Sequence, residues 1–229
     1  MGFNPEEERM PTVYVSIFDG NLITRAKENE AGAVSRVNKE DRTVWEHHHK
    51  NGLTGNLVNI TASQNPRIAK NPWEFIIEMR DAAKRYLISV SADSRYGEDL
   101  ACKIPSLEYG KETKIKPFDF ENPEDKEKKI IGISFIQEGA KVPRFITKDN
   151  PMGRPQTEGR LDDDDYKIHM VKVKKFYREI VLNHGNPDKG FPAPISSEAS
   201  QPATSALQPN NEFDKGAPTP TEEDDELPF

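Results

Sequence analysis

The chain has 229 residues, of which 34% are hydrophobic and 31% are charged. This length suits one domain with appendages or two small domains, and the low apolar fraction argues against a fully packed chain. A single cysteine, Cys102, excludes an internal disulfide and a thiolate zinc cage, so we expect a reducing compartment. The N-terminus lacks the features of a signal peptide, and no apolar run approaches the roughly 18 to 20 residues that span a bilayer. We therefore expect a cytoplasmic protein without a membrane partner.

The net charge of -7 is confined to the C-terminal part of the chain. Residues 186–229 contain nine Asp and Glu against two Lys, whereas residues 1–185 contain thirty residues of each sign. A neutral body can still concentrate cations on one face, so the acidic total does not exclude a phosphate-backbone partner.

The body reads mostly as β-strands in chain order. Residues 12–26 alternate between apolar and polar side chains and predict one strand with a bend or bulge at Asp19-Gly20. Residues 27–55 are expected to form a long loop insertion, and residues 56–63 a shorter strand. Residues 73–80 and 84–91 predict a hairpin joined at 81–83. A short helix is expected around 93–102, capped by Asp93 or Ser94, and strands at 114–121 and 128–138 follow.

Residues 162–184 form the best predicted helix, because aspartates begin it and Gly185 follows it. One apolar face is expected to pack on the body or on another subunit, which leaves a homo-oligomer open; it comprises Met170, Val173, Phe176, Tyr177 and Ile180.

The element order predicts a mainly β protein with an OB-fold, a five-stranded Greek-key barrel with a helix between strands three and four. We expect a nucleic-acid-binding OB domain at 1–161 and the C-terminal helix at 162–185. Residues 186–229 are rich in Pro, Ser, Ala, Gln and acids, which predicts a disordered linker and tip.

The last residues read EEDDELPF and end the chain on a phenylalanine. This tip resembles the C-terminal tip of bacterial and phage single-stranded DNA-binding proteins, with Leu227 where that family usually has isoleucine. A terminal ring can enter an apolar pocket while its free carboxylate pairs with a basic residue. The predicted partner-binding residues are Asp224, Asp225, Glu226, Leu227, Pro228 and Phe229.

The resemblance implies a bacterial or phage protein without catalysis that coats single-stranded DNA during replication, recombination or repair. Because the body lacks a strong match to the bacterial core, we favour a divergent, phage-like member and leave a cellular origin open. It also implies partners such as a helicase, a nuclease, a primase or a recombination mediator. Two alternatives stay open: an adaptor whose barrel binds protein rather than DNA, and a nuclease with a recruiting tail.

A sequence-tolerant DNA surface needs cations and free aromatic faces. Alternation places the lysines and phenylalanines of residues 114–120 on one face, and Tyr14 with Phe18 on one face of the first strand. Tyr86 and Phe135 are instead in phase with core residues. Trp45 is either a base-stacking residue or a plug that closes the insertion. The predicted DNA-binding residues are Tyr14, Phe18, Arg25, Trp45, Trp73, Arg80, Lys84, Arg85, Lys114, Lys116, Phe118 and Phe120.

Three adjacent histidines, His47, His48 and His49, do not make a convincing metal site, because neighbours in a strand point to opposite faces. The aspartates at 162–165 are better explained as the start of a helix. No phosphate-cradling Gly-rich motif is present, so we expect no metal and no cofactor.

Overall fold

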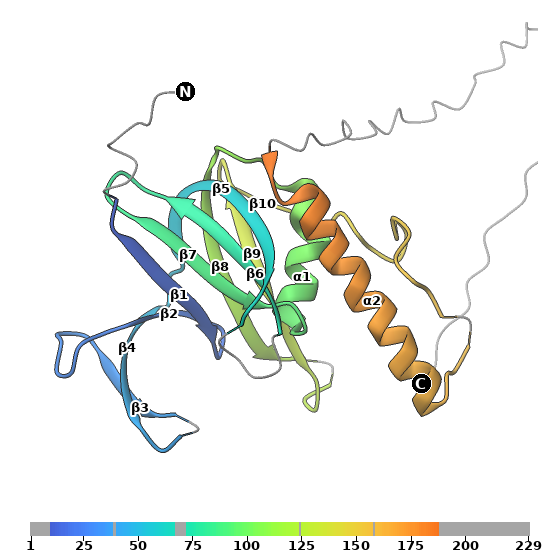
Figure 1. Cartoon of the computed structure of the whole chain (residues 1–229), viewed down its shortest axis with the longest axis horizontal. Coiled ribbons are helices and arrows are strands. Elements are labelled where there is room, and N and C mark those ends of the chain that lie inside the picture. Colours follow the sequence, from blue (N-terminus) through green and yellow to red (C-terminus); the bar gives the residue numbers. More distant parts are fainter. Residues whose placement is uncertain (1–9, 39, 67–71, 124, 158, 188–229) are drawn as a thin grey trace, which may run out of the picture. The chain divides into compact units, whose positions relative to one another are not determined.

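The computed structural model describes residues 10–38, 40–66, 72–123, 125–157 and 159–187, all within the unit Met1–Pro192. Its strands form one ten-stranded sheet in the order β10-β9-β8-β5-β6-β7-β1-β2-β4-β3 (Figure 1). The strands are β1 (Thr12–Phe18), β2 (Asn21–Arg25), β3 (Val34–Val37), β4 (Thr43–His49), β5 (Leu53–Gln64), β6 (Trp73–Arg80), β7 (Arg85–Ser91), β8 (Glu112–Glu121), β9 (Lys129–Gln137) and β10 (Ala140–Lys141). The helices are α1 (Arg95–Lys103), the short 3-10 helix η2 (Ile104–Ser106) and α2 (Asp163–His184).

The predicted mainly β class, the short inter-strand helix and the C-terminal helix are confirmed. β6 and β7 form the predicted hairpin, whose turn is closed by the Asp81 carboxylate accepting hydrogen bonds from the backbone of Ala83 and Lys84. Ser94 caps α1 by accepting a hydrogen bond from the Gly97 nitrogen. The hydrogen-bonded strands form an open sheet, however, rather than a closed five-stranded barrel.

Two predictions for the N-terminal part are wrong. Residues 12–26 form two strands rather than one bent strand, because Asp19 and Gly20 both have positive φ angles, 46° and 71°, and turn the chain back. Such two-residue turns match the twist of paired strands, which is why Asp-Gly favours hairpins. Residues 27–55 are not one long loop either, since they contain β3, β4 and the start of β5.

The central strands follow a Greek-key path. β8 lies beside β5, and β5, β6 and β7 form a meander, which gives the spatial order of strands four, one, two, three. β1 then extends the sheet by pairing with β7 in parallel. The inward face holds the core, in which Phe75, Ile115 and Phe135 are fully buried. Phe135 is thus confirmed as a core residue, and Tyr86 packs against the same core as predicted.

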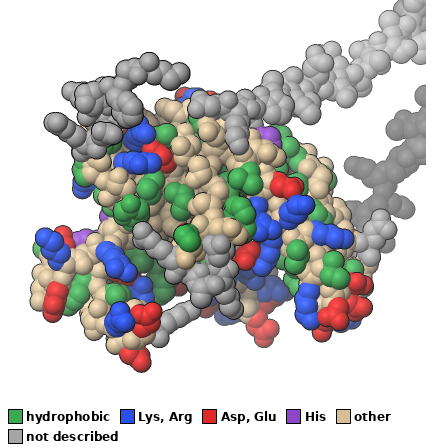
Figure 2. Space-filling view, in the orientation of Figure 1, with side chains coloured by type: hydrophobic (Ala, Val, Ile, Leu, Met, Phe, Trp, Pro, Cys, Tyr) green, Lys and Arg blue, Asp and Glu red, His purple; other side chains and the backbone are tan. Residues whose placement is uncertain are grey.

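α2 packs on the body of its own chain through the predicted apolar face. Val173, Tyr177 and Ile180 are buried there, and the helix contacts α1, η2 and β5. Asp162 caps its start by accepting hydrogen bonds from the nitrogens of Asp164 and Asp165, which confirms the predicted role of the aspartates. Figure 2 shows basic side chains along α2 and acidic ones at its N-terminal end. No helix in the described part of the chain is long and apolar enough to cross a membrane.

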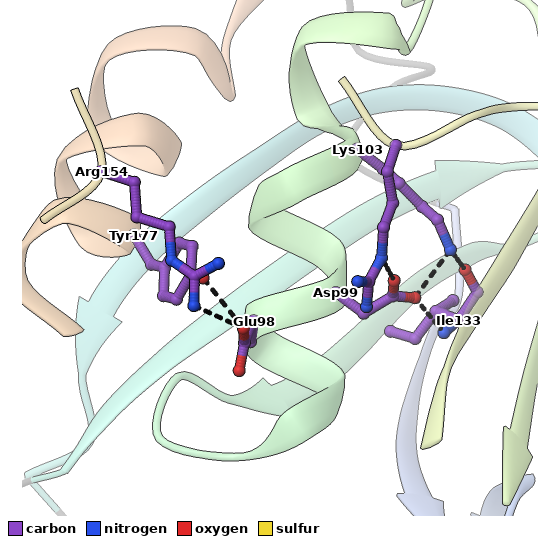
Figure 3. Close-up of polar contacts among 7 residues, drawn as sticks. Glu98, Asp99, Lys103, Ile133, Arg154 and Tyr177 are labelled. Carbon is purple, nitrogen blue, oxygen red and sulfur yellow. Dashed lines mark hydrogen bonds and ion pairs between the residues drawn. The ribbon is translucent and has the colours of Figure 1, made fainter. Parts of the chain in front are cut away.

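Side chains of α1 complete the hydrogen bonding of β9. The Ile133 nitrogen donates to Asp99 Oδ2 at 2.7 Å, and the Ile133 oxygen accepts from Lys103 Nζ at 2.6 Å (Figure 3). Lys103 also contacts Asp99 Oδ2 at 2.7 Å, and Arg144 Nε donates to Asp99 Oδ1 at 2.6 Å. Burial lowers the pKa of Lys103, although its bond to Asp99 opposes that shift. The Asp99–Lys103 pair therefore occupies the position that a neighbouring strand would take.

Candidate nucleic-acid interface

One face of β1 carries exposed aromatic side chains. Tyr14 is 74% exposed and Phe18 is 45% exposed, whereas Val15 on the opposite face is buried. The two rings share a face because they are four residues apart in a strand, where side chains alternate with a period of two. We call this face the first row; it comprises Thr12, Tyr14, Ser16 and Phe18.

A groove of about 540 Å³ lies along the first row, where β2, β4 and β3 continue the sheet; its lining includes Arg25, Arg36 and Glu46. Arg36 donates two hydrogen bonds to the Glu46 carboxylate, at 2.7 and 2.8 Å, and its guanidinium lies 4.6 Å from the centre of the Phe18 ring. The bonds to Glu46 raise the pKa of Arg36. Arg36 therefore stays charged and holds Phe18 in place while the ring remains partly exposed.

The sequence did not single out Arg36. It lies in the segment expected to be a loop, and its strand β3 has only four residues. The signal that could have found it is weak: two β-branched valines, Val34 and Val37, and a second β-rich run that begins at Thr43. Arg25, which was predicted, lies on β2 opposite Glu46 of β4.

The predicted basic cluster at the β6–β7 hairpin lies on the same side of the sheet as the first row, because Arg85 is in register with Thr12. Lys84 is exposed, while Arg85 and Arg80 both pair with the buried carboxylate of Glu78 at 2.9 Å. The structure therefore places two guanidiniums at fixed positions rather than on mobile side chains. The side chains are partly exposed, at 37% for Arg80 and 40% for Arg85, so both positive charges lie at the surface.

Glu78 makes the stability of this cluster pH-dependent. Burial raises the pKa of Glu78, but the hydrogen bonds from Arg85 and Arg80 outweigh burial, so the pKa lies below its ordinary value of 4.5. The ionised Glu78 carboxylate therefore makes its full contribution to the free energy of unfolding above about pH 4.5. This contribution is lost as the pH falls through the lower folded-state pKa. We expect Glu78→Gln to reduce the free energy of unfolding by about 1–3 kcal/mol at pH 7. The difference between the two proteins should shrink below pH 4.5 in urea titrations; a pH-independent difference would contradict this assignment.

β8 carries a second row of basic and aromatic side chains. Lys114 and Lys116 are exposed, Phe118 is half-buried and Phe120 is 50% exposed, while Ile115 between them is buried. The predicted alternation of β8 is therefore confirmed. The Phe118 ring lies 5.6 Å from that of Phe120 and 5.9 Å from the Nζ atoms of both Lys103 and Lys141. We call Lys114, Lys116, Phe118 and Phe120 the second row.

The two tryptophans lie outside both rows. Trp45 is half-buried in β4, and because it neighbours Glu46 it points to the opposite side of the sheet from the groove. Trp73 packs against the core at the far end of β6 from Arg80, and the Arg178 guanidinium of α2 lies 5.3 Å from its ring centre. Trp73, which was predicted as a DNA-binding residue, therefore lies apart from both rows.

The three histidines lie in β4 rather than in a loop. His49 Nε2 is 3.1 Å from Thr24 Oγ1, and His47 Nε2 is 3.3 Å from Glu30 Oε1. Within the described ranges, no three His, Cys, Asp or Glu side chains are grouped closely enough to hold a metal ion. The predicted partner-binding tip, residues 224–229, lies outside the described residues. No family model, curated protein or solved structure matches the chain.

Proposed function

We propose that this protein binds and coats single-stranded DNA without strong sequence preference and recruits other replication or repair proteins through its C-terminal tip. One observation carries the proposal: exposed aromatic rings lie beside cations on two surfaces, where Phe18 of β1 neighbours Arg36 of β3 and where Phe120 of β8 shares its face with two lysines. Rings accept any base by stacking, and cations follow the phosphate backbone, so the combination favours single strands of any sequence.

The strand order supports an OB-like body for this function. β5, β6, β7 and β8 correspond to strands one to four of that fold, with α1 between the third and fourth, and β9 follows β8 as the fifth. The chain differs from the OB-fold in that its sheet does not close into a barrel. β7 pairs with the N-terminal β1 instead, and α1 covers the edge of β9 at Ile133. The additional strands β1 to β4 supply the first row and its groove.

The tip supplies the second half of the proposal. Its Leu-Pro-Phe run, preceded by five acids, suits an apolar pocket with a basic rim on a partner protein. The family resemblance favours a helicase, a nuclease, a primase or a recombination mediator as the partner protein that carries this pocket.

Fluorescence anisotropy of a labelled oligothymidine of about 16 nucleotides tests the proposed binding of single-stranded DNA. We expect tighter binding to this strand than to a duplex of equal length, with affinity that falls as salt rises because counterions are released. An adaptor whose body binds protein would leave the oligonucleotide unbound, and a nuclease would shorten it in the presence of magnesium. Either result would contradict the proposal.

Removing residues 222–229 is expected to tighten DNA binding at low salt, because an acidic segment competes with phosphate for the cations of the body. The same deletion should abolish capture of a purified helicase or primase. The matched variant Phe229→Ala keeps all five acids and should lose the partner while leaving DNA affinity unchanged. A truncated protein that bound DNA no better and kept every partner would contradict the role of the tip.

A further inference from the structure

The first and second rows meet at the turn between β1 and β2. A Cβ added to Gly20 would lie 2.9 Å from the Asp119 nitrogen and 3.5 Å from the Phe118 carbonyl carbon, so this turn packs against the β8 backbone. Phe18 precedes Gly20 by two residues. The backbone at the end of the first row therefore lies against the backbone of the second row, although β1 and β8 are not hydrogen-bonded neighbours.

The junction is held by side chains from α1 and β9. The Tyr96 hydroxyl accepts a hydrogen bond from the Gly20 nitrogen at 3.1 Å. Lys129 Nζ lies 3.1 Å from Asp119 Oδ1, and Arg95 Nη1 donates to the Lys129 carbonyl oxygen at 2.9 Å. These contacts fix the turn on β8, so the two rows keep a constant relative position.

We infer that one DNA strand occupies both rows in succession and crosses from β1 to β8 at this junction, an inference that rests on the proposed function. Phe18 and Phe120, 45% and 50% exposed, offer ring surface on the two sides of the crossing. Cations accompany each, Arg36 beside Phe18 and Lys116 on β8.

The length of the rows supports a shared strand. From Tyr14 to Phe18, and again from Lys116 to Phe120, the chain advances four residues, or about 13 Å at roughly 3.3 Å per residue. One row alone is long enough only for a site near the short end of the roughly 4 to 16 nucleotides that OB-like proteins occupy. Both rows together double this length to about 26 Å, so a longer strand can contact both.

Oligothymidines of about 4 and about 16 nucleotides test this path in anisotropy titrations of the full chain. The second-row variant Lys116→Ala/Phe120→Ala changes two exposed side chains and should keep its melting temperature. We expect it to bind the long strand at least about 10-fold more weakly than wild type, because it loses one stacking surface and one phosphate contact. Its affinity for the short strand should stay within about twofold of wild type, since the groove beside the first row is intact.

The matched control is Tyr166→Ala/Lys175→Ala, which removes an exposed ring and an exposed lysine from α2 and should leave both affinities unchanged. A second-row variant that binds both lengths as wild type does would overturn the shared path while the proposed function stands. Equal weakening at both lengths would also overturn it, because the second row would then be the primary site. A wild-type protein that binds neither strand would contradict the proposed function itself.

Discussion

Replacing Tyr14 and Phe18 together with alanine is expected to weaken binding of a 16-nucleotide oligothymidine by at least about 30-fold. Stacking of a base on an aromatic side chain contributes about 1–3 kcal/mol, so the loss of two rings costs roughly 2 kcal/mol or more. Both side chains are exposed, at 74% and 45%, and no core packing is lost. Fluorescence anisotropy at constant salt measures the effect, because affinities at different salt concentrations are not comparable.

Tyr166→Ala is the matched control for the first-row variant. Tyr166 is an exposed tyrosine, 55% exposed, but it lies at the start of α2 and outside both rows. We expect its affinity to equal that of wild type. If the Tyr14 and Phe18 variant bound as tightly as this control, β1 would not be part of the DNA surface.

Asp99→Ala is expected to have the largest effect on stability, lowering the free energy of unfolding by about 3–5 kcal/mol. The Asp99 and Lys103 side chains are only 2% and 6% exposed, so removal of the carboxylate leaves a buried ammonium without its counter-charge. The Ile133 nitrogen would also lose its acceptor at the edge of β9. The loss is a large fraction of the roughly 5–15 kcal/mol that stabilises a typical domain.

Urea unfolding monitored by circular dichroism measures the free energy of unfolding of Asp99→Ala, with Lys111→Ala as the control variant. Lys111 pairs with Glu108 and Glu138 on the surface at 2.8 and 2.7 Å, and such exposed pairs contribute only about 0–1 kcal/mol. Asp99→Asn, which keeps an acceptor for Ile133 but loses the charge, should fall between the two. Equal stability of Asp99→Ala and Lys111→Ala would show that the pair does not protect the β9 edge.

The alternation of individual strands was predictable from the sequence because burial on one face leaves a period of two. Lys116 and Phe120 are exposed and Ile115 is buried as that period requires, and Tyr14 is exposed while Val15 is buried. The hairpin of β6 and β7 was predictable as well, because two β-rich runs flank a short connection that begins with Asp81.

Pairings between distant segments left no such pattern. The parallel contact of β1 with β7 joins residues 12–16 to 85–89, and nothing in either run specifies its neighbour. β3 has four residues and two exposed valines, so its burial pattern is too weak to distinguish a strand from a loop. Arg36 and its groove were therefore missed, and nothing near Trp73 in the sequence indicated that Arg178 of the distant helix α2 lies 5.3 Å from its ring centre.

The most direct test of the account is to locate the bound strand on the protein. Ultraviolet cross-linking of a 5-iodouracil-containing single strand to the full chain, followed by peptide mass spectrometry, identifies the aromatic side chains in contact with bases. We predict cross-links at Tyr14 and Phe18 of β1 and at Phe120 of β8, all of which are exposed. Cross-links confined to α2 or to Trp73, with none on β1 or β8, would contradict the central claim that these two rows form the DNA surface.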